Sequence, residues 1–185
     1  MRRRSFLRAA PAAALANLIA HPALAAQIAT PIPSPDLHPV ASGEDRFGAL
    51  HSLGFSDLAF KVGTQETGGN LFMIEHRNLR PGGPALHLHL NQEEWFYVME
   101  GEIAFVVGEK KLTLKAGESI LAPRRIPHTF SSVVAAGHLL IGFAPAGKME
   151  QYFRDAKQDG ALAATPEYMN RYDMQWIGPS PFRQE

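Results

Sequence analysis

The sequence predicts an all-β fold, a barrel or sandwich, with short helices toward its C-terminus. Between residues 58 and 143, short runs rich in aromatic and β-branched residues are separated by turns that contain Gly, Pro or Asn. No helical segment interrupts this series, which is typical of barrels and sandwiches. The expected strands are 58–62, 71–78, 86–90, 94–100, 103–107, 111–115, 119–122, 128–134 and 138–143.

The segment after the last expected strand has a helical character. Residues 149–157 carry an apolar stripe at helical spacing. Thr165 followed by Pro166 combines an N-cap residue with proline in the first turn, which predicts the start of a second short helix. We expect both helices to cover one end of the barrel. The stripe consists of Met149, Tyr152, Phe153 and Ala156.

The N-terminal residues have the composition of an export signal. A basic head precedes an apolar, alanine-rich stretch, and small residues suited to cleavage end at about residue 26. Arg3-Arg4-Ser5-Phe6-Leu7-Arg8 resembles the twin-arginine export pattern. We therefore expect a periplasmic or secreted protein. The predicted organisation is a signal peptide (1–26), a Pro-rich extended segment that is a tether or an ordered arm (27–43), a barrel (44–146) and a helical extension (147–185).

Composition restricts the function further. Lys and Arg number 18, Asp and Glu number 18, and removal of the four signal arginines leaves 14 basic residues and a net charge of −4. A mildly acidic domain without a basic cluster is not expected to bind nucleic acid. No later apolar run could span a bilayer, so we expect no membrane association after signal removal. Without cysteine, any metal site must use imidazole and carboxylate ligands.

One histidine pair indicates such a site. His87 and His89 are two residues apart, and side chains at i and i+2 of a strand point to the same face. Glu94 follows after a turn, so its carboxylate can return on the adjacent strand. His128 opens a later strand after a proline-containing turn, and barrel closure can bring it opposite the first pair. The neighbouring carboxylate, Glu93, is the competing ligand, but strand parity places it on the opposite face.

These residues resemble a known family. The pattern HxHxxxxExxxxxxG from His87 to Gly101 is similar to the first cupin motif, and GxxxxxP followed by His128 is similar to the second. The stretch EEWFYVMEGE is closest to quercetin-dioxygenase-like cupins. The resemblance implies a single cupin domain, a conical jelly-roll β-barrel, with metal ligands at His87, His89, Glu94 and His128.

The sequence departs from the motifs without losing a ligand. Pro81 stands where the first motif has glycine, although Gly82 is adjacent. Arg125 and Ser132 replace the usual glycine and asparagine of the second motif. Arg125 is expected to change the turn beside the site and to narrow its mouth.

Three imidazoles and one carboxylate would bind one divalent transition metal, Fe, Mn, Ni, Co or Cu. Zinc is less favoured because it prefers a closed tetrahedral site. The leading hypothesis is an oxidoreductase, a dioxygenase acting on an enolic or phenolic small molecule, with Glu94 as the catalytic base. The alternatives are a non-oxidative isomerase, epimerase or lyase, and a periplasmic metabolite-binding cupin. Strand parity suggests pocket residues; they are Phe96, Val98, Phe105 and Phe130.

The remaining histidines are expected to be ordinary surface or core residues. They are His21, His38, His51, His76 and His138. By analogy with cupins that dimerise through barrel edges, the sequence is also compatible with a homodimer.

Overall fold

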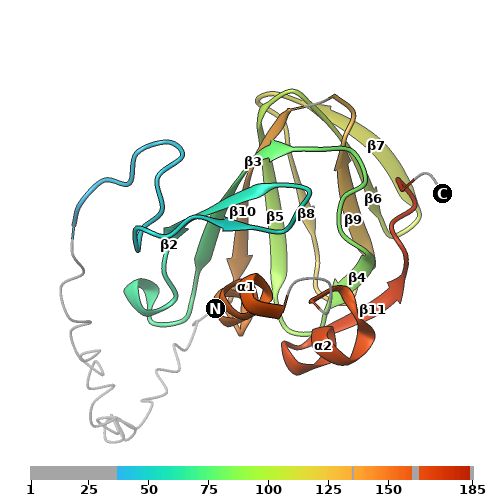
Figure 1. Ribbon diagram of the computed structural model, residues 1–185. Helices are drawn as coiled ribbons and strands as arrows, with labels where there is room; N and C mark the ends of the chain where they lie inside the picture. Colours follow the sequence, from blue (N-terminus) through green and yellow to red (C-terminus); the bar gives the residue numbers. More distant parts are fainter. Residues whose placement is uncertain (1–36, 135, 160–162, 184–185) are drawn as a thin grey trace, which may run out of the picture. The chain divides into compact units, whose positions relative to one another are not determined.

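The computed structural model describes residues 37–134, 136–159 and 163–183. Their strands form two antiparallel sheets, called sheet A and sheet B here (Figure 1). The expected signal peptide and the first part of the Pro-rich segment lie outside the described residues. Sheet A has the order β1 (His51–Ser52), β2 (Asp57–Val62), β3 (Phe72–Leu79), β10 (Gly137–Ala144), β5 (Glu93–Glu100) and β8 (Ser119–Ala122). Sheet B has the order β11 (Met174–Gly178), β4 (Leu86–His89), β9 (His128–Ser132), β6 (Glu102–Val107) and β7 (Lys110–Lys115).

The expected all-β class and the jelly-roll arrangement are confirmed. Each of the nine strands expected from the sequence is present within two residues of its predicted ends. Two strands were not expected: the short β1, and β11, which follows the helices and joins sheet B beside β4. The C-terminal segment is therefore helical only in part, because its last strand completes the sheet that carries the histidine pair.

Strand β5 shows how alternation directs side chains into the core. Glu94, Phe96 and Val98 are buried on the inner face, whereas Trp95 and Tyr97 on the outer face remain partly exposed. Full burial of a large apolar side chain such as Phe96 contributes about 1.5–3 kcal/mol. The same alternation that fills the core thus points one carboxylate inward among apolar residues.

The end of the Pro-rich segment is an ordered arm against sheet A. The Gly43 N–H and the Ser42 hydroxyl donate hydrogen bonds to the buried carboxylate of Glu75 at 3.0 and 3.3 Å. Lys61 Nζ and His138 Nε2 complete the surroundings of this carboxylate at 3.0 and 2.7 Å. Glu75 therefore ties the arm to β2, β3 and β10.

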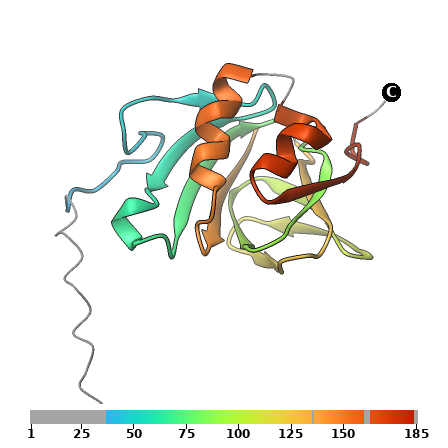
Figure 2. The same cartoon turned by 90° about the horizontal axis from the view of Figure 1, so that it is seen from below.

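Two helices lie together at one end of the barrel, α1 (Met149–Asp159) and α2 (Pro166–Arg171), as Figure 2 shows. The Thr165 side chain accepts a hydrogen bond from Tyr168 N at 3.3 Å, as the sequence predicted for the N-cap. Tyr152 of α1 packs edge-on against Tyr168, with ring centroids 5.8 Å apart. None of the described helices is long and apolar enough to cross a membrane.

Candidate metal centre

The four expected ligands come from both sheets. His87 and His89 lie on β4 and His128 on the neighbouring β9, where His87 and His128 are direct partners in the antiparallel register. Residues directly opposite each other in an antiparallel pair project from the same face of the sheet, with Cβ atoms about 4.5–5.5 Å apart. The imidazoles of His87 and His128 therefore lie on the same face. Glu94 reaches the cluster from β5 of sheet A. The cluster therefore forms only when the two sheets close on each other.

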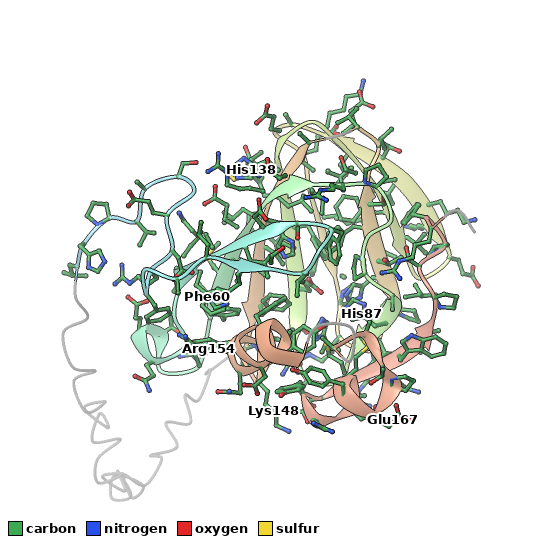
Figure 3. The ribbon with its side chains drawn as sticks, viewed as in Figure 1. Phe60, His87, His138, Lys148, Arg154 and Glu167 are labelled. Atoms are coloured by element: carbon green, nitrogen blue, oxygen red, sulfur yellow. The ribbon has the colours of Figure 1, made fainter. Side chains whose placement is uncertain are left out.

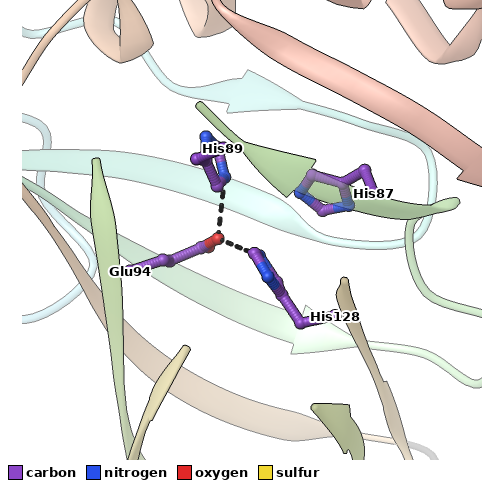
Figure 4. A group of neighbouring side chains, drawn as sticks. All are labelled: His87, His89, Glu94 and His128. Atoms are coloured by element: carbon purple, nitrogen blue, oxygen red, sulfur yellow. Dashed lines mark hydrogen bonds and ion pairs between the residues drawn. The ribbon is translucent and has the colours of Figure 1, made fainter. Parts of the chain in front are cut away.

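The side chains of these four residues meet inside the barrel (Figure 4). Each offers one ligand atom, and these atoms lie within 4.8 Å of one another. Glu94 Oε2 lies 2.9 Å from His89 Nε2 and 2.8 Å from His128 Nε2. All four residues are buried, and His87 is the most accessible at 7%. The sequence prediction of one convergent set is thus matched by the geometry.

Backbone carbonyls fix the orientation of two of the rings. His87 Nδ1 lies 2.8 Å from the Ala85 carbonyl, and His128 Nδ1 lies 2.9 Å from the Ile126 carbonyl. A carbonyl oxygen can only accept, so each Nδ1 must carry a proton and donate it. The Nε2 atoms are left for the cluster. Such a bond from the non-ligating nitrogen is the usual support of metal-binding histidines.

The electrostatics favour neutral imidazoles at His87 and His89 and an ionised carboxylate at Glu94. Burial, reinforced by the neighbouring imidazoles of His128 and His89, lowers the pKa of His87 to about 3. Burial also lowers the pKa of His89, against the opposing effect of Glu94. For Glu94, burial alone raises the pKa, but hydrogen bonds from His128 and His89 outweigh it and hold the pKa well below 4.5. These are the protonation states that metal ligation requires.

The donor set fits a divalent cation. Ligands on opposite sides of a first-row ion lie roughly 4.2 Å apart, since each bond is about 2.1 Å long, and the observed spread of 4.8 Å is close to this. A buried carboxylate also needs compensating positive charge. Three imidazole nitrogens and one carboxylate oxygen are suitable for a transition metal. The cluster can therefore bind a metal, and the donor set leaves the identity of that metal open.

The structure places the competing carboxylate, Glu93, and Arg125, one of the departures from the cupin motifs. Glu93 lies outside the cluster and pairs with Arg124. Arg125, which stands where the motif has glycine, adopts a left-handed conformation with φ of 64°, and its N–H donates to the His89 carbonyl at 2.7 Å. The Arg125 side chain is not among the residues that line the cavity beside the cluster. The expected narrowing of the cavity mouth by Arg125 is therefore not observed.

A cavity of about 460 Å³ opens beside the cluster. His87, His89 and Glu94 form part of its wall, and α1, the segment 52–55 and single residues of α2 and β11 contribute to the remainder. Its apolar wall residues include Phe130, Phe143, Met149, Phe153, Met169 and Met174.

Among the four suggested pocket residues, Phe130 lines this cavity and the other three do not. Phe96, Val98 and Phe105 point inward as parity indicated, but they are at most 1% exposed and pack within the core. The correction has a physical reason. The inner face of a strand is longer than the cavity, and only the part near the C-terminal helices remains open.

His76 was expected to be ordinary, yet it lines the cavity. It is 1% exposed, and its Nε2 has no hydrogen-bond partner among the described residues. A signal was present in the sequence, since His76 shares a strand face with Phe72 and Ile74, both fully buried. By contrast, His138 pairs with Glu75 and lies away from the cluster, as Figure 3 shows by the positions of His138 and His87.

Comparison with known proteins gives one family match. Residues 76–137, about a third of the chain, match the Cupin domain family. This range includes all four residues of the cluster. A search of curated proteins finds no match.

Several solved structures are similar at low identity. KdgF from Halomonas sp. is 16% identical, with 52% of this chain and 86% of that chain covered and a TM-score of 0.48. An RmlC-like cupin from Shewanella frigidimarina is 20% identical, with 55% and 87% covered and a TM-score of 0.48. A Streptomyces PAC13 variant with uridine is 13% identical, with 71% and 84% covered and a TM-score of 0.49.

The fold and the family match bear on the class of protein. Two antiparallel sheets with few short helices are consistent with a cupin jelly-roll domain. The Cupin domain match, together with this fold, supports the cupin superfamily, with a buried His87–His89–Glu94–His128 cluster that could bind a metal.

Proposed function

We propose that this protein is a metal-dependent cupin enzyme, a dioxygenase that acts on an enolic or phenolic small molecule, as its resemblance to quercetin-dioxygenase-like cupins suggests. The observation that carries the proposal is the position of the cluster. His87, His89 and Glu94 form part of the wall of an otherwise mainly apolar cavity of about 460 Å³. A concave apolar pocket with a few convergent polar groups is the usual form of a small-molecule site.

The four ligands would hold one divalent ion, and a redox-active ion there would supply Lewis acidity and electron transfer between substrate and dioxygen. Around it, the protein contributes orientation and exclusion of water. The imidazoles of His87 and His128 are fixed by the Ala85 and Ile126 carbonyls, so their Nε2 atoms need no reorganisation. Phe130, Phe143 and other apolar side chains of the cavity wall would surround the body of the substrate.

Glu94 is the proposed proton acceptor for the substrate hydroxyl. In the metal-free cluster its carboxylate is ionised at neutral pH, because hydrogen bonds from His128 and His89 outweigh the effect of burial and keep its pKa low. A bound cation would favour the same ionised form in their place. A carboxylate with a low pKa is a weak base, so it accepts a proton efficiently only from a hydroxyl that is itself acidified. Enols and phenols bound at a cation meet this condition, whereas simple alcohols do so far less well.

Oxygen consumption tests the proposal. The protein is stripped of metal, reconstituted separately with Fe, Mn, Co, Ni or Cu, and assayed with quercetin and with simpler enediols in an oxygen electrode. We expect substrate-dependent oxygen uptake with at least one metal, its loss in Glu94→Gln, and its retention in Glu93→Gln, which changes the adjacent surface carboxylate. Substrate turnover under anaerobic conditions, or no uptake with any metal, would contradict a dioxygenase.

A further inference from the structure

The polar groups of the cavity are not confined to the metal-binding cluster. His76 lies on β3 of sheet A and contributes to the same cavity wall as His87, His89 and Glu94. Its ring packs edge-on against Phe130 and Phe153, with centroids 5.8 and 6.3 Å apart. The ring is therefore held in one orientation by aromatic neighbours.

The hydrogen bond of the other ring nitrogen assigns the tautomer. His76 Nδ1 lies 2.9 Å from the Ser56 hydroxyl oxygen, and both residues are buried. In the described part of the chain, this nitrogen is the hydrogen-bond partner of that hydroxyl. If Nδ1 carried the proton, the buried Ser56 O–H would have no acceptor. The Ser56 hydroxyl therefore donates to Nδ1, and the single proton of the neutral ring is on Nε2.

Neutrality of the ring follows from its surroundings. Burial lowers the pKa of His76 to about 3, although the negative charge of Glu94 opposes this shift. The ring thus presents a neutral N–H donor, and this buried donor has no partner among the described residues. A phenylalanine or leucine could fill the same space among aromatic rings without leaving a polar group unsatisfied. A buried polar atom in a cavity wall is better explained by a ligand that accepts its hydrogen bond.

We propose that His76 is a second ligand-binding residue, whose Nε2–H donates a hydrogen bond to an oxygen acceptor on the small molecule held at the metal-binding cluster. The ligand class then has two oxygen functions and an apolar body between them. An enolic or phenolic oxygen lies at the cluster, and a carbonyl or comparable acceptor lies at His76. This inference rests on the proposed small-molecule site and adds to it a determinant of specificity and orientation.

Matched catechols provide the test. The first pair is 3,4-dihydroxyacetophenone and 4-ethylcatechol, which differ by a carbonyl in place of a methylene. The second pair is 3,4-dihydroxyphenylacetone and 4-propylcatechol, whose variable group lies one carbon further from the ring. Dissociation constants are measured anaerobically by calorimetry on nickel-loaded protein. For each variant, the ratio of the two dissociation constants within a pair measures the preference for the ketone over the alkyl compound. An effect of a substitution that is equal for both compounds cancels in this ratio.

We expect the wild type to prefer the ketone in at least one pair. His76→Leu should reduce that preference about three- to tenfold, the usual effect of one hydrogen bond, while nickel stoichiometry is unchanged. His76→Gln, whose amide nitrogen can replace the Nε2 donor, should retain most of the preference. Ser56→Ala should weaken it, because the tautomer is then no longer fixed.

The outcomes separate the inference from the proposed function. If the catechols bind and His76→Leu leaves the preference for the ketone unchanged in both pairs, His76 makes no hydrogen bond to the ligand and the inference is overturned. If no catechol binds to nickel-loaded wild type, the small-molecule site fails and the inference fails with it. Long-range ¹⁵N–¹H NMR of zinc-loaded protein tests the tautomer independently, and a proton on Nδ1 of His76 would also overturn the inference.

Discussion

Replacement of Glu94 by glutamine should weaken the stabilisation of the protein by divalent metal. In the native protein, Glu94 Oε2 lies 2.9 and 2.8 Å from two imidazole nitrogens, and the residue is 4% exposed. Glutamine keeps the shape and one acceptor oxygen but removes the negative charge. The change therefore tests the charge contribution of this carboxylate to metal affinity with little change in packing.

The magnitude follows from linkage. A metal that binds only the native state stabilises it by about 4.1 kcal/mol when its concentration is 1,000 times Kd. For a domain of this size, about 2–4 °C corresponds to each kcal/mol, so the midpoint of thermal unfolding should rise by roughly 8–16 °C. Glu94→Gln should reduce affinity at least tenfold and so remove at least about 1.4 kcal/mol, or roughly 3–6 °C, of this increase.

The assay is thermal unfolding monitored by circular dichroism, with EDTA and then with excess nickel or cobalt. Glu93→Gln is the matched control, because the same substitution one residue away affects only the surface pair with Arg124. It should show the wild-type increase. An equal increase in Glu94→Gln and wild type would refute the reasoning, and so would a wild type whose midpoint does not respond to metal.

Four further predictions address the cluster, the cavity, the turn and the signal. His89→Ala should lower the metal content of purified protein at least tenfold by elemental analysis, since one of four ligands is lost; near-complete occupancy would exclude His89 as a ligand. In metal-free protein, His76 has a pKa lowered from 6.5 to about 3, so its stability contribution is present above pH 6.5 and is lost as pH falls toward 3. Urea unfolding between pH 6 and 4 should therefore show a wild-type slope steeper than that of His76→Gln by about 1.4 kcal/mol per pH unit, and equal slopes would contradict a buried neutral ring. Arg125→Gly should raise the free energy of unfolding by about 1 kcal/mol, because φ at this position is 64° and glycine adopts it without strain; a loss of stability would show that the Arg125 side chain is more important than the backbone. Lys at both Arg3 and Arg4 should abolish export in cell fractionation, and unchanged export would exclude the twin-arginine route.

Most of the His87–His89–Glu94–His128 cluster could be predicted from the sequence, because the determinants of three of its four residues are local. His87 and His89 share a face by strand parity, and the same parity selects Glu94 over Glu93. His128 is the exception, since its approach depends on pairing of β4 with β9. Barrel closure and the resemblance to the second cupin motif predict that His128 approaches the histidine pair, but they do not predict that β4 and β9 are paired neighbours.

The cavity could not be predicted in the same way. Its wall depends on where α1, α2 and β11 pack, and these contacts are distant in sequence from the metal ligands. Strand β11 is five residues long, and its partner β4 lies far from it in the sequence, so the pairing is not a local feature. For this reason strand parity alone predicts Phe96 and Val98 as pocket residues, although they lie within the closed core.

The role of His76 in the cavity could not be predicted from the sequence either. Its position on an apolar strand face was visible in the sequence, but a single inward histidine is usually a satisfied core residue. Its significance comes from Ser56 and Phe153, which lie in segments separate from its own strand. Only the packed structure shows that one ring nitrogen is bonded to Ser56 while the other lacks a partner among the described residues.

The central claim is that the four residues of the metal-binding cluster together bind one metal ion. Anomalous X-ray diffraction tests it most directly, with data collected from crystals of nickel-loaded protein above and below the metal absorption edge. We predict a single strong anomalous peak inside the barrel, about 2.1 Å from one atom each of His87, His89, Glu94 and His128. A peak at another position, or a peak here that His128 does not contact, would contradict the account of this site.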